Sequence, residues 1–315
     1  MSVPEATPGS HKLRPVPAQF PHDPGQFPHD PARPLAVHVL GEEHREGVRV
    51  LDLTCDDGAG GRVSAYLVAP ATHTTLAPGP EPAGSIEGGP GVVWAHWFDS
   101  EHPNADRTEF LPEAVDLAAQ GVTSLLPQGA FPWASDPTDS TTDRGKIESE
   151  VLRLRRGLDL LLAGIEANVA PRHRPVRPVD AARMAMVGHD FGGMAVAVAV
   201  AVDRRPVAGV IMAATPRWGD WFLPFWPIVE DRLAYLAGLR LVDPIEWVGR
   251  LAPAAVLYQL ARRDFYIARM TGHELHRATS EPRELRWYDA EHDLDLAEAR
   301  ADRLAFLRER LGLAS

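Results

Sequence analysis

The sequence predicts an α/β fold with a mostly parallel central sheet, antiparallel strands at its N-terminal side and a short aromatic-rich lid. Short β-branched runs separated by glycine and acidic turns occupy residues 35–70, a pattern typical of an antiparallel meander. From residue 91 onward, buried apolar runs alternate with helical patterns, which indicates parallel strands covered by helices on both faces. A length of 315 residues with 45% hydrophobic content suits one large domain.

Residues 1–34 differ from the rest, because they are rich in proline and histidine and repeat QFPHDP from Gln19 and from Gln26. Without apolar periodicity we expect this arm to be extended, disordered or draped over the surface. His22 and His29 form a possible metal pair, but proline spacing fixes no ligand geometry, so we predict no metal and no cofactor. Residues 35–315 are predicted to form one domain, with a lid insertion at 216–251.

The expected elements of the domain follow one another without internal repeats. The N-terminal strands are LAVHVL, GVRVLDLT and RVSAYLVAP, starting at Leu35, Gly47 and Arg62. The parallel strands are then expected at 91–97, 122–128, 182–190, 207–215, 254–261 and 284–289, with helices at 109–121, around 147–161, from Phe191, after 261 and at Leu294–Leu311. The single cysteine, Cys55, follows a strand beside acidic residues that raise a thiol pKa, so we interpret it as structural.

The segment GHDFGG, at 188–193, joins a buried strand to a helix of small residues. A residue at such a turn is held in a strained conformation, and glycines around it let the strand and helix approach closely. Asp190 occupies the position of the nucleophile in such a turn, and the backbone N–H of Phe191 would point at an oxyanion formed on the substrate.

This turn resembles the nucleophile elbow of the α/β-hydrolase superfamily, with Asp190 where most members have serine. The superfamily order of nucleophile, acid and histidine implies Asp264, after AAVLYQLA, and His292, in YDAEHDL. Asp220 is the reserve acid. His96 in WAHWFDS matches the family's HG-type motif, which implies Phe98 N–H as the second oxyanion donor, although Trp97 replaces the usual glycine.

The elbow resembles that of epoxide hydrolases and haloalkane dehalogenases, whereas the remaining chain is similar to dienelactone hydrolase and related esterases. A carboxylate attacks an ester poorly but displaces a leaving group from an sp³ carbon. The resemblance therefore implies a covalent alkyl-Asp190 intermediate on an epoxide or alkyl halide, hydrolysed by water that His292 activates while Asp264 orients the histidine. Phe191 replaces the usual tryptophan, and the lid is short and contains only Tyr235 as a tyrosine acid.

Two other interpretations stay open. One is a dienelactone-hydrolase-like ester or lactone hydrolase in which Asp190 forms no intermediate, and the other is a non-hydrolytic lyase, cyclase or binding protein. The aromatic lid predicts a pocket for a small apolar organic substrate, although the same side chains equally fit a lid core or a homodimer surface. The predicted pocket residues are His96, Trp97, Trp218, Trp221, Phe222, Trp226 and Tyr266.

Charge and composition limit the partners and the compartment. A net charge of −11 without a basic stripe argues against nucleic acid. No apolar run is long enough for a bilayer and no secretory h-region is visible, so we expect a cytoplasmic protein without membrane contact. With only Lys12 and Lys146 against many arginines, the composition suggests a GC-rich bacterial source.

Overall fold

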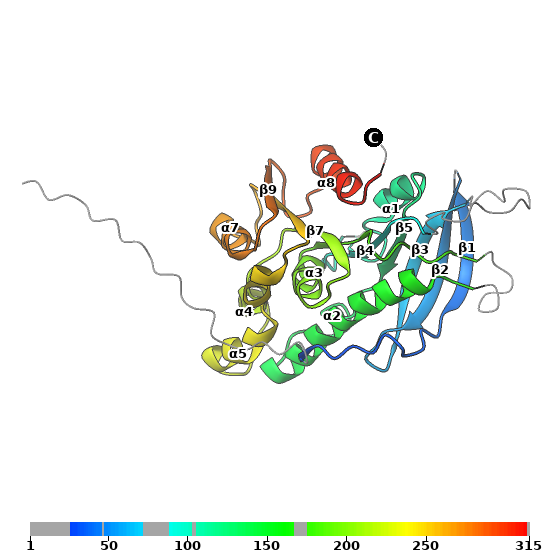
Figure 1. The fold of residues 1–315 in the computed structure, drawn as a ribbon. Helices are drawn as coiled ribbons and strands as arrows, with labels where there is room; N and C mark the ends of the chain where they lie inside the picture. Colours follow the sequence, from blue (N-terminus) through cyan, green and yellow to red (C-terminus); the bar gives the residue numbers. More distant parts are fainter. Residues whose placement is uncertain (1–25, 46, 72–87, 103–104, 167–174, 314–315) are drawn as a thin grey trace, which may run out of the picture.

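The computed structural model describes residues 26–45, 47–71, 88–102, 105–166 and 175–313. Within these residues, nine strands form one sheet in the order β1-β2-β3-β5-β4-β6-β7-β8-β9 (Figure 1). Pairs β1/β2, β2/β3 and β3/β5 are antiparallel, and every later pair is parallel. The predicted mostly parallel sheet with antiparallel N-terminal strands is therefore confirmed.

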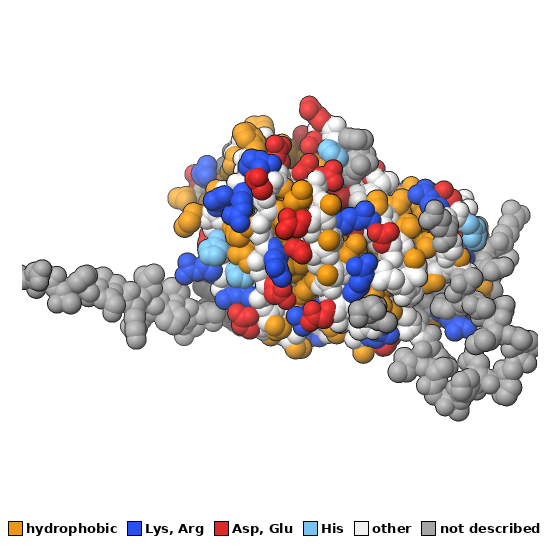
Figure 2. All heavy atoms as spheres, turned by 90° about the horizontal axis from the view of Figure 1, so that it is seen from above, with side chains coloured by type: hydrophobic (Ala, Val, Ile, Leu, Met, Phe, Trp, Pro, Cys, Tyr) orange, Lys and Arg blue, Asp and Glu red, His pale blue; other side chains and the backbone are white. Residues whose placement is uncertain are grey.

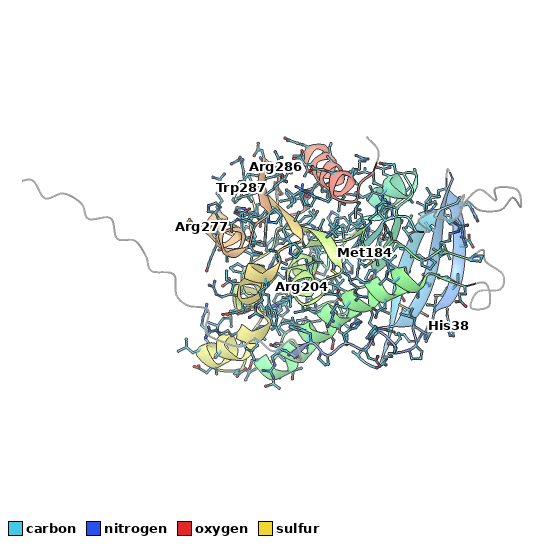
Figure 3. The ribbon with its side chains drawn as sticks, in the orientation of Figure 1. His38, Met184, Arg204, Arg277, Arg286 and Trp287 are labelled. Atoms are coloured by element: carbon cyan, nitrogen blue, oxygen red, sulfur yellow. The ribbon has the colours of Figure 1, made fainter. Side chains whose placement is uncertain are left out.

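The strands are β1 (His38–Arg45), β2 (Val48–Asp56), β3 (Arg62–Pro70), β4 (Gly91–Ala95), β5 (Thr123–Pro127), β6 (Met184–His189), β7 (Pro206–Met212), β8 (Ala255–Ala261) and β9 (Arg283–Tyr288). The helices are α1 (Leu111–Ala118), α2 (Ser140–Ala163), α3 (Phe191–Val202), α4 (Trp218–Phe225), α5 (Arg232–Leu239), α6 (Pro244–Trp247), α7 (Arg269–Ala278) and α8 (Ala297–Arg310). Figure 3 places His38 at the β1 edge of the sheet and Arg286 and Trp287 at the β9 edge.

Two elements begin later than the sequence suggests, because a positive φ interrupts each pattern. Leu294 has φ +50°, so α8 starts at Ala297 rather than at Leu294. Ala36 has φ +47°, so β1 starts at His38 rather than at Leu35. Neither value is compatible with a regular right-handed helix or strand.

The helices cover both faces of the sheet, with α1 and α8 on one side and α2 and α3 on the other (Figure 1). Every residue of β4, β5, β6 and β8 is buried, as expected for parallel strands covered on both faces. At the amino end of β6, Arg183 Nε donates to the carbonyl oxygen of Leu311 at 2.8 Å. This bond holds the C-terminal end of α8 against that edge of the sheet.

The lid insertion rests on the N-terminal end of α2. Tyr235 on α5 donates its hydroxyl to Asp143 Oδ2 at 2.8 Å, and Ser140 N–H donates to Glu230 at 2.8 Å. Tyr235 is buried, and its hydroxyl proton is used in this contact. It therefore anchors the lid to α2.

The described part of the N-terminal arm packs against the domain. Phe27 is buried, with its ring 5.2 Å from that of Trp247, and His29 Nε2 lies 2.7 Å from Asp159. His22 lies outside the described residues. In the part of the chain that the structure describes, no group of three or more His, Cys, Asp or Glu side chains is arranged to hold a metal ion.

The surface seen in Figure 2 carries acidic and basic side chains interspersed, without a continuous basic stripe on this face. Among the described residues, no helix combines the length and the apolar character needed to cross a bilayer.

Candidate active site

The turn between β6 and α3 holds Asp190 in a strained conformation, with φ +53° and ψ −118°. Its N–H donates to the Met212 carbonyl oxygen at 2.9 Å. A Cβ on Gly188 would collide with the Gly192 carbonyl oxygen, and one on Gly192 with the Ala95 carbonyl oxygen. Glycine is therefore required at both positions, and the motif forms a sharp strand–turn–helix elbow with Asp190 at its turn.

The structure brings Asp190, His292 and Asp264 together. His292 Nδ1 lies 2.9 Å from Asp264 Oδ2, while Asp264 Oδ1 accepts the N–H groups of Tyr266 and Ile267, both at 2.9 Å. His292 Nε2 lies 3.9 Å from Asp190 Oδ1, too far for a direct hydrogen bond, and neither atom has a hydrogen-bond partner among the described protein groups. These two atoms are positioned to bind one small polar group jointly.

The reserve acid, Asp220, is not part of this arrangement. Its carboxylate lies 3.7 Å from Arg217 on the same segment, whereas Asp264 holds the histidine. The acid position after β8 is thus the one that the geometry supports.

Burial and charge set the protonation of the pair. Burial lowers the pKa of His292, but the carboxylates of Asp190 and Asp264 outweigh it and raise that pKa to about 10. Burial raises the pKa of Asp190, and His292 opposes this shift. The two carboxylates therefore favour the charged form of His292, whereas the base of a serine triad is neutral.

The loop after β4 supplies a backbone donor. Phe98 N–H donates to Asp190 Oδ2 at 3.4 Å, so the predicted oxyanion donor faces the carboxylate itself. His96 fixes this loop, because its Nε2 accepts the Gly129 N–H at 2.9 Å and its Nδ1 donates to the Trp97 carbonyl oxygen at 2.8 Å. Burial lowers the pKa of His96 to about 4, so the ring stays neutral and acts as a structural support. Phe191 begins α3, where helix N–H groups lack intrahelical partners.

Aromatic rings enclose the reactive pair. The ring of His292 lies 5.0 Å from that of Tyr266, 5.5 Å from that of Trp221 and 5.8 Å from that of Trp97. Around Phe191, the rings of Trp218, Phe222 and Trp226 lie 5.7 to 6.4 Å away. Asp190 has no exposed surface and His292 is 4% exposed.

A small cavity of about 20 Å³ lies next to Phe191 and Gly192 of the elbow, and Asp190 and His292 are not among the residues that line it. Of the predicted pocket residues, His96 and Trp218 line it, and the other five lie around His292 and Phe191 instead. Sequence reasoning missed Phe131 and Trp133, which also line it. The signal was available, since GAFPWAS follows a parallel strand and loops at that position line sites in such folds.

A larger polar hollow of about 360 Å³ lies beyond Trp97. Its walls carry acids and arginines together, among them Glu109, Glu113, Asp293, Arg300 and Arg303. This mixed lining contrasts with the apolar surroundings of Asp190.

No family model matches the sequence, and no curated protein is similar to it in sequence. Solved structures are similar to it in fold. An acetyl xylan esterase from Paenibacillus sp. R4 has a TM-score of 0.63 at 18% identity, over 88% of this chain and 89% of that one. A glucuronoyl esterase from Solibacter usitatus has 0.58 at 14%, over 89% and 88%. An alpha/beta hydrolase, GrgF, from Penicillium sp. sh18 has 0.51 at 15%, over 81% and 96%. The chain therefore has the α/β-hydrolase fold.

Proposed function

We propose that the protein is a hydrolase of short-chain carboxylic esters or lactones in which Asp190 and His292 act on water without a covalent intermediate. The observation that carries this proposal is the pair of unpartnered atoms at the elbow, Asp190 Oδ1 and His292 Nε2, 3.9 Å apart. The esterase names of the structural neighbours support the ester hydrolase over the epoxide or halide enzyme that the elbow motif alone suggests.

In this mechanism, a water molecule accepts a hydrogen bond from His292 Nε2–H and donates one to Asp190 Oδ1. As the water oxygen bonds to the ester carbonyl carbon, its proton passes to Asp190. The tetrahedral oxyanion accepts hydrogen bonds from the backbone N–H groups of Phe98 and Phe191. The Phe98 N–H can leave Asp190 for the oxyanion, because its bond to Asp190 is long and therefore weak, at 3.4 Å. His292 then gives its Nε2 proton to the departing alkoxide and recovers one from Asp190.

The small cavity limits the acyl group. A volume of about 20 Å³ between Phe191 and Trp133 has room for little more than one water-sized group, which matches a methyl group. Acetyl esters are accordingly the expected substrates, and longer acyl chains would require the aromatic walls to move.

A covalent alkyl-Asp190 route is the second candidate, and one contact favours it. In that route the ester carbonyl oxygen formed on Asp190 becomes an oxyanion when water attacks, and Phe98 N–H already faces Oδ2 of that carboxylate. The substrate would then be an epoxide or an alkyl halide.

A single-turnover reaction in ¹⁸O-water distinguishes the two routes. With excess enzyme over p-nitrophenyl acetate, direct water attack puts ¹⁸O into acetate and leaves the Asp190 peptide unlabelled by mass spectrometry. With terminal epoxides or 1-haloalkanes, the alkyl route labels Asp190 in the first turnover, and His292→Gln accumulates an alkyl adduct on it.

The control for the ester reaction is Asp190→Asn, which keeps the shape of the side chain but cannot accept the proton. Hydrolysis of acetyl esters and lactones that is no faster in the natural protein than in Asp190→Asn would overturn the proposal. Label on Asp190 during ester turnover would overturn the direct route.

A further inference from the structure

Glu109 and His189 form a hydrogen-bonded pair outside the three residues of the reaction, with the His189 ring fully buried and the Glu109 side chain 13% exposed at the wall of the polar hollow. His189 Nδ1 lies 2.7 Å from Glu109 Oε1, and His189 Nε2 lies 2.9 Å from the backbone carbonyl oxygen of His292. The other carboxyl oxygen, Glu109 Oε2, accepts the Trp97 N–H at 2.9 Å. The pair thus connects the loop that carries Phe98, the strand end next to Asp190 and the loop that carries His292.

The hydrogen-bond partners of His189 and Glu109 determine where the protons of this pair can reside. A carbonyl oxygen only accepts, so His189 Nε2 must carry the proton that bonds to His292. The short contact between His189 Nδ1 and Glu109 Oε1 then needs one more proton, which resides on either the ring or the carboxyl group. His189 is therefore an imidazolium beside a carboxylate, or a neutral ring beside a carboxylic acid.

The surroundings favour the neutral form. The ring of His189 has no exposed surface, and its centroid lies 5.5 Å from that of His292, whose charged form two carboxylates favour. Burial raises the pKa of Glu109, while His189, the Trp97 N–H and Arg303 on α8 oppose this shift. A second imidazolium so close to His292 would be repelled, and the neutral pair makes the same hydrogen bonds as the charged one.

We propose that Glu109, as a neutral acid, and His189 are positioning residues that hold Phe98 N–H and the His292 ring at fixed places around Asp190. The role follows from the connections: Glu109 holds the Trp97 N–H, directly before Phe98, His189 holds the His292 carbonyl oxygen, and the bond between the two side chains couples these contacts. The ring of Trp97 reinforces the link, stacked 5.3 Å from His189 at 20°. This inference rests on the proposed function for its effect on turnover, but not for its effect on His292.

Three variants test it. Glu109→Gln keeps an oxygen for Trp97 N–H and an N–H₂ group for His189 Nδ1, so it reproduces the neutral acid. Glu109→Met keeps the length and loses both bonds. Glu101→Gln, on an exposed residue of the same loop, is the matched control.

We expect Glu109→Met to lower kcat for p-nitrophenyl acetate by about tenfold or more with little change in KM, because misplaced catalytic groups slow the chemical step. Glu109→Gln should retain most of the turnover, and Glu101→Gln all of it. If Glu109→Met fails to fold, His189→Gln takes its place, since glutamine still donates to the His292 carbonyl oxygen but lacks the ring.

NMR of the ¹⁵N-labelled imidazole of His292 provides the readout that does not need turnover. The Nδ1–H signal of His292, bonded to Asp264, should shift or broaden in Glu109→Met and stay in place in Glu109→Gln. If no ester is hydrolysed, this difference still supports the positioning role while the proposed function fails. If Glu109→Met keeps the kcat of the natural protein and an unchanged His292 signal, the inference is overturned. If Glu109→Gln lowers kcat and shifts the signal as much as Glu109→Met does, the neutral form of the pair is overturned.

Discussion

Asp190 presents its two carboxylate oxygens to different partners: Oδ2 accepts the Phe98 N–H at 3.4 Å, and Oδ1 faces His292 Nε2 at 3.9 Å. A serine at this position would have one oxygen, which would face the histidine and leave the Phe98 donor free for substrate. In the proposed mechanism the aspartate therefore serves as the base through one oxygen, while its other oxygen occupies the Phe98 N–H before substrate binds.

Replacing the carboxylate by a hydroxyl should therefore create a serine nucleophile. Asp190→Ser is expected to react covalently with a fluorophosphonate probe, because the elbow, His292 and two backbone donors then match the serine geometry. The natural protein, without a hydroxyl at the elbow, should not react. Intact mass before and after incubation measures the adduct, and Asp190→Ser combined with His292→Gln is the control. Labelling of the natural protein at another residue, or an inert Asp190→Ser, would contradict the expectation.

Removing the charge of Asp190 should lower the pKa of His292. In the natural protein two carboxylates raise that pKa to about 10, and Asp190→Asn removes one of them. NMR titration of the His292 ring gives the pKa in both proteins. An unchanged pKa in Asp190→Asn would show that Asp264 alone sets it.

The same pair makes stability depend on alkaline pH. The folded pKa of His292, about 10, lies above its unfolded value of about 6.5, so the stabilisation is fully present below pH 6.5 and is lost as the pH rises through 10. Urea unfolding at pH 7, 8.5 and 10 should show a fall in the free energy of unfolding that His292→Gln reduces. A parallel fall in both proteins would assign it to other groups.

Asp243, which bonds to the first residue of α4 in the lid, should make the protein more stable at acidic pH than at neutral pH. Burial raises its pKa to about 7, while its Oδ1 accepts the Trp218 N–H at 2.9 Å. Because the folded pKa exceeds the unfolded one, its stabilising contribution is present below about pH 4 and is lost as the pH rises through 7. Asp243→Asn keeps the hydrogen-bond acceptor but cannot ionise. Relative to the natural protein, its free energy of unfolding should therefore rise by up to about 4 kcal/mol between pH 4 and pH 8, at 1.36 kcal/mol per pKa unit. Equal pH dependence of unfolding in both proteins would refute this.

The glycines of the elbow should be intolerant of a methyl group, whereas a helix glycine should benefit from one. Gly192→Ala places a Cβ against the carbonyl oxygen of Ala95 and should cost about 1 to 3 kcal/mol or more. Gly145→Ala on α2 meets nothing within 4 Å and should gain about 0.5 to 1 kcal/mol. Thermal unfolding of the two variants measures both effects. Equal melting temperatures would show that the elbow relaxes around the added group.

Local patterns were enough to predict the sheet and the three central residues. The strand–GHDFGG–helix segment and the strand ends before Asp264 and His292 are visible in the sequence, because apolar periodicity and glycine placement are local properties. The Glu109–His189 link was not predictable, since it joins segments 80 residues apart and depends on distances that only folding sets.

The packing of Phe27 against Trp247 could not be predicted either, because a single apolar residue among prolines shows no helical or strand periodicity. The positive φ of Leu294 belongs to the same class, since leucine carries no local preference for it.

Arg183 holds the carbonyl oxygen of Leu311 at the amino end of β6, whereas Asp190 follows the carboxyl end of that strand. The strand between them spans about 20 Å at roughly 3.3 Å per residue. A support or fluorophore coupled near Leu311 would therefore lie at the amino edge of the sheet, about one strand length from Asp190. For immobilisation or single-molecule work, this edge is the attachment side opposite to the elbow.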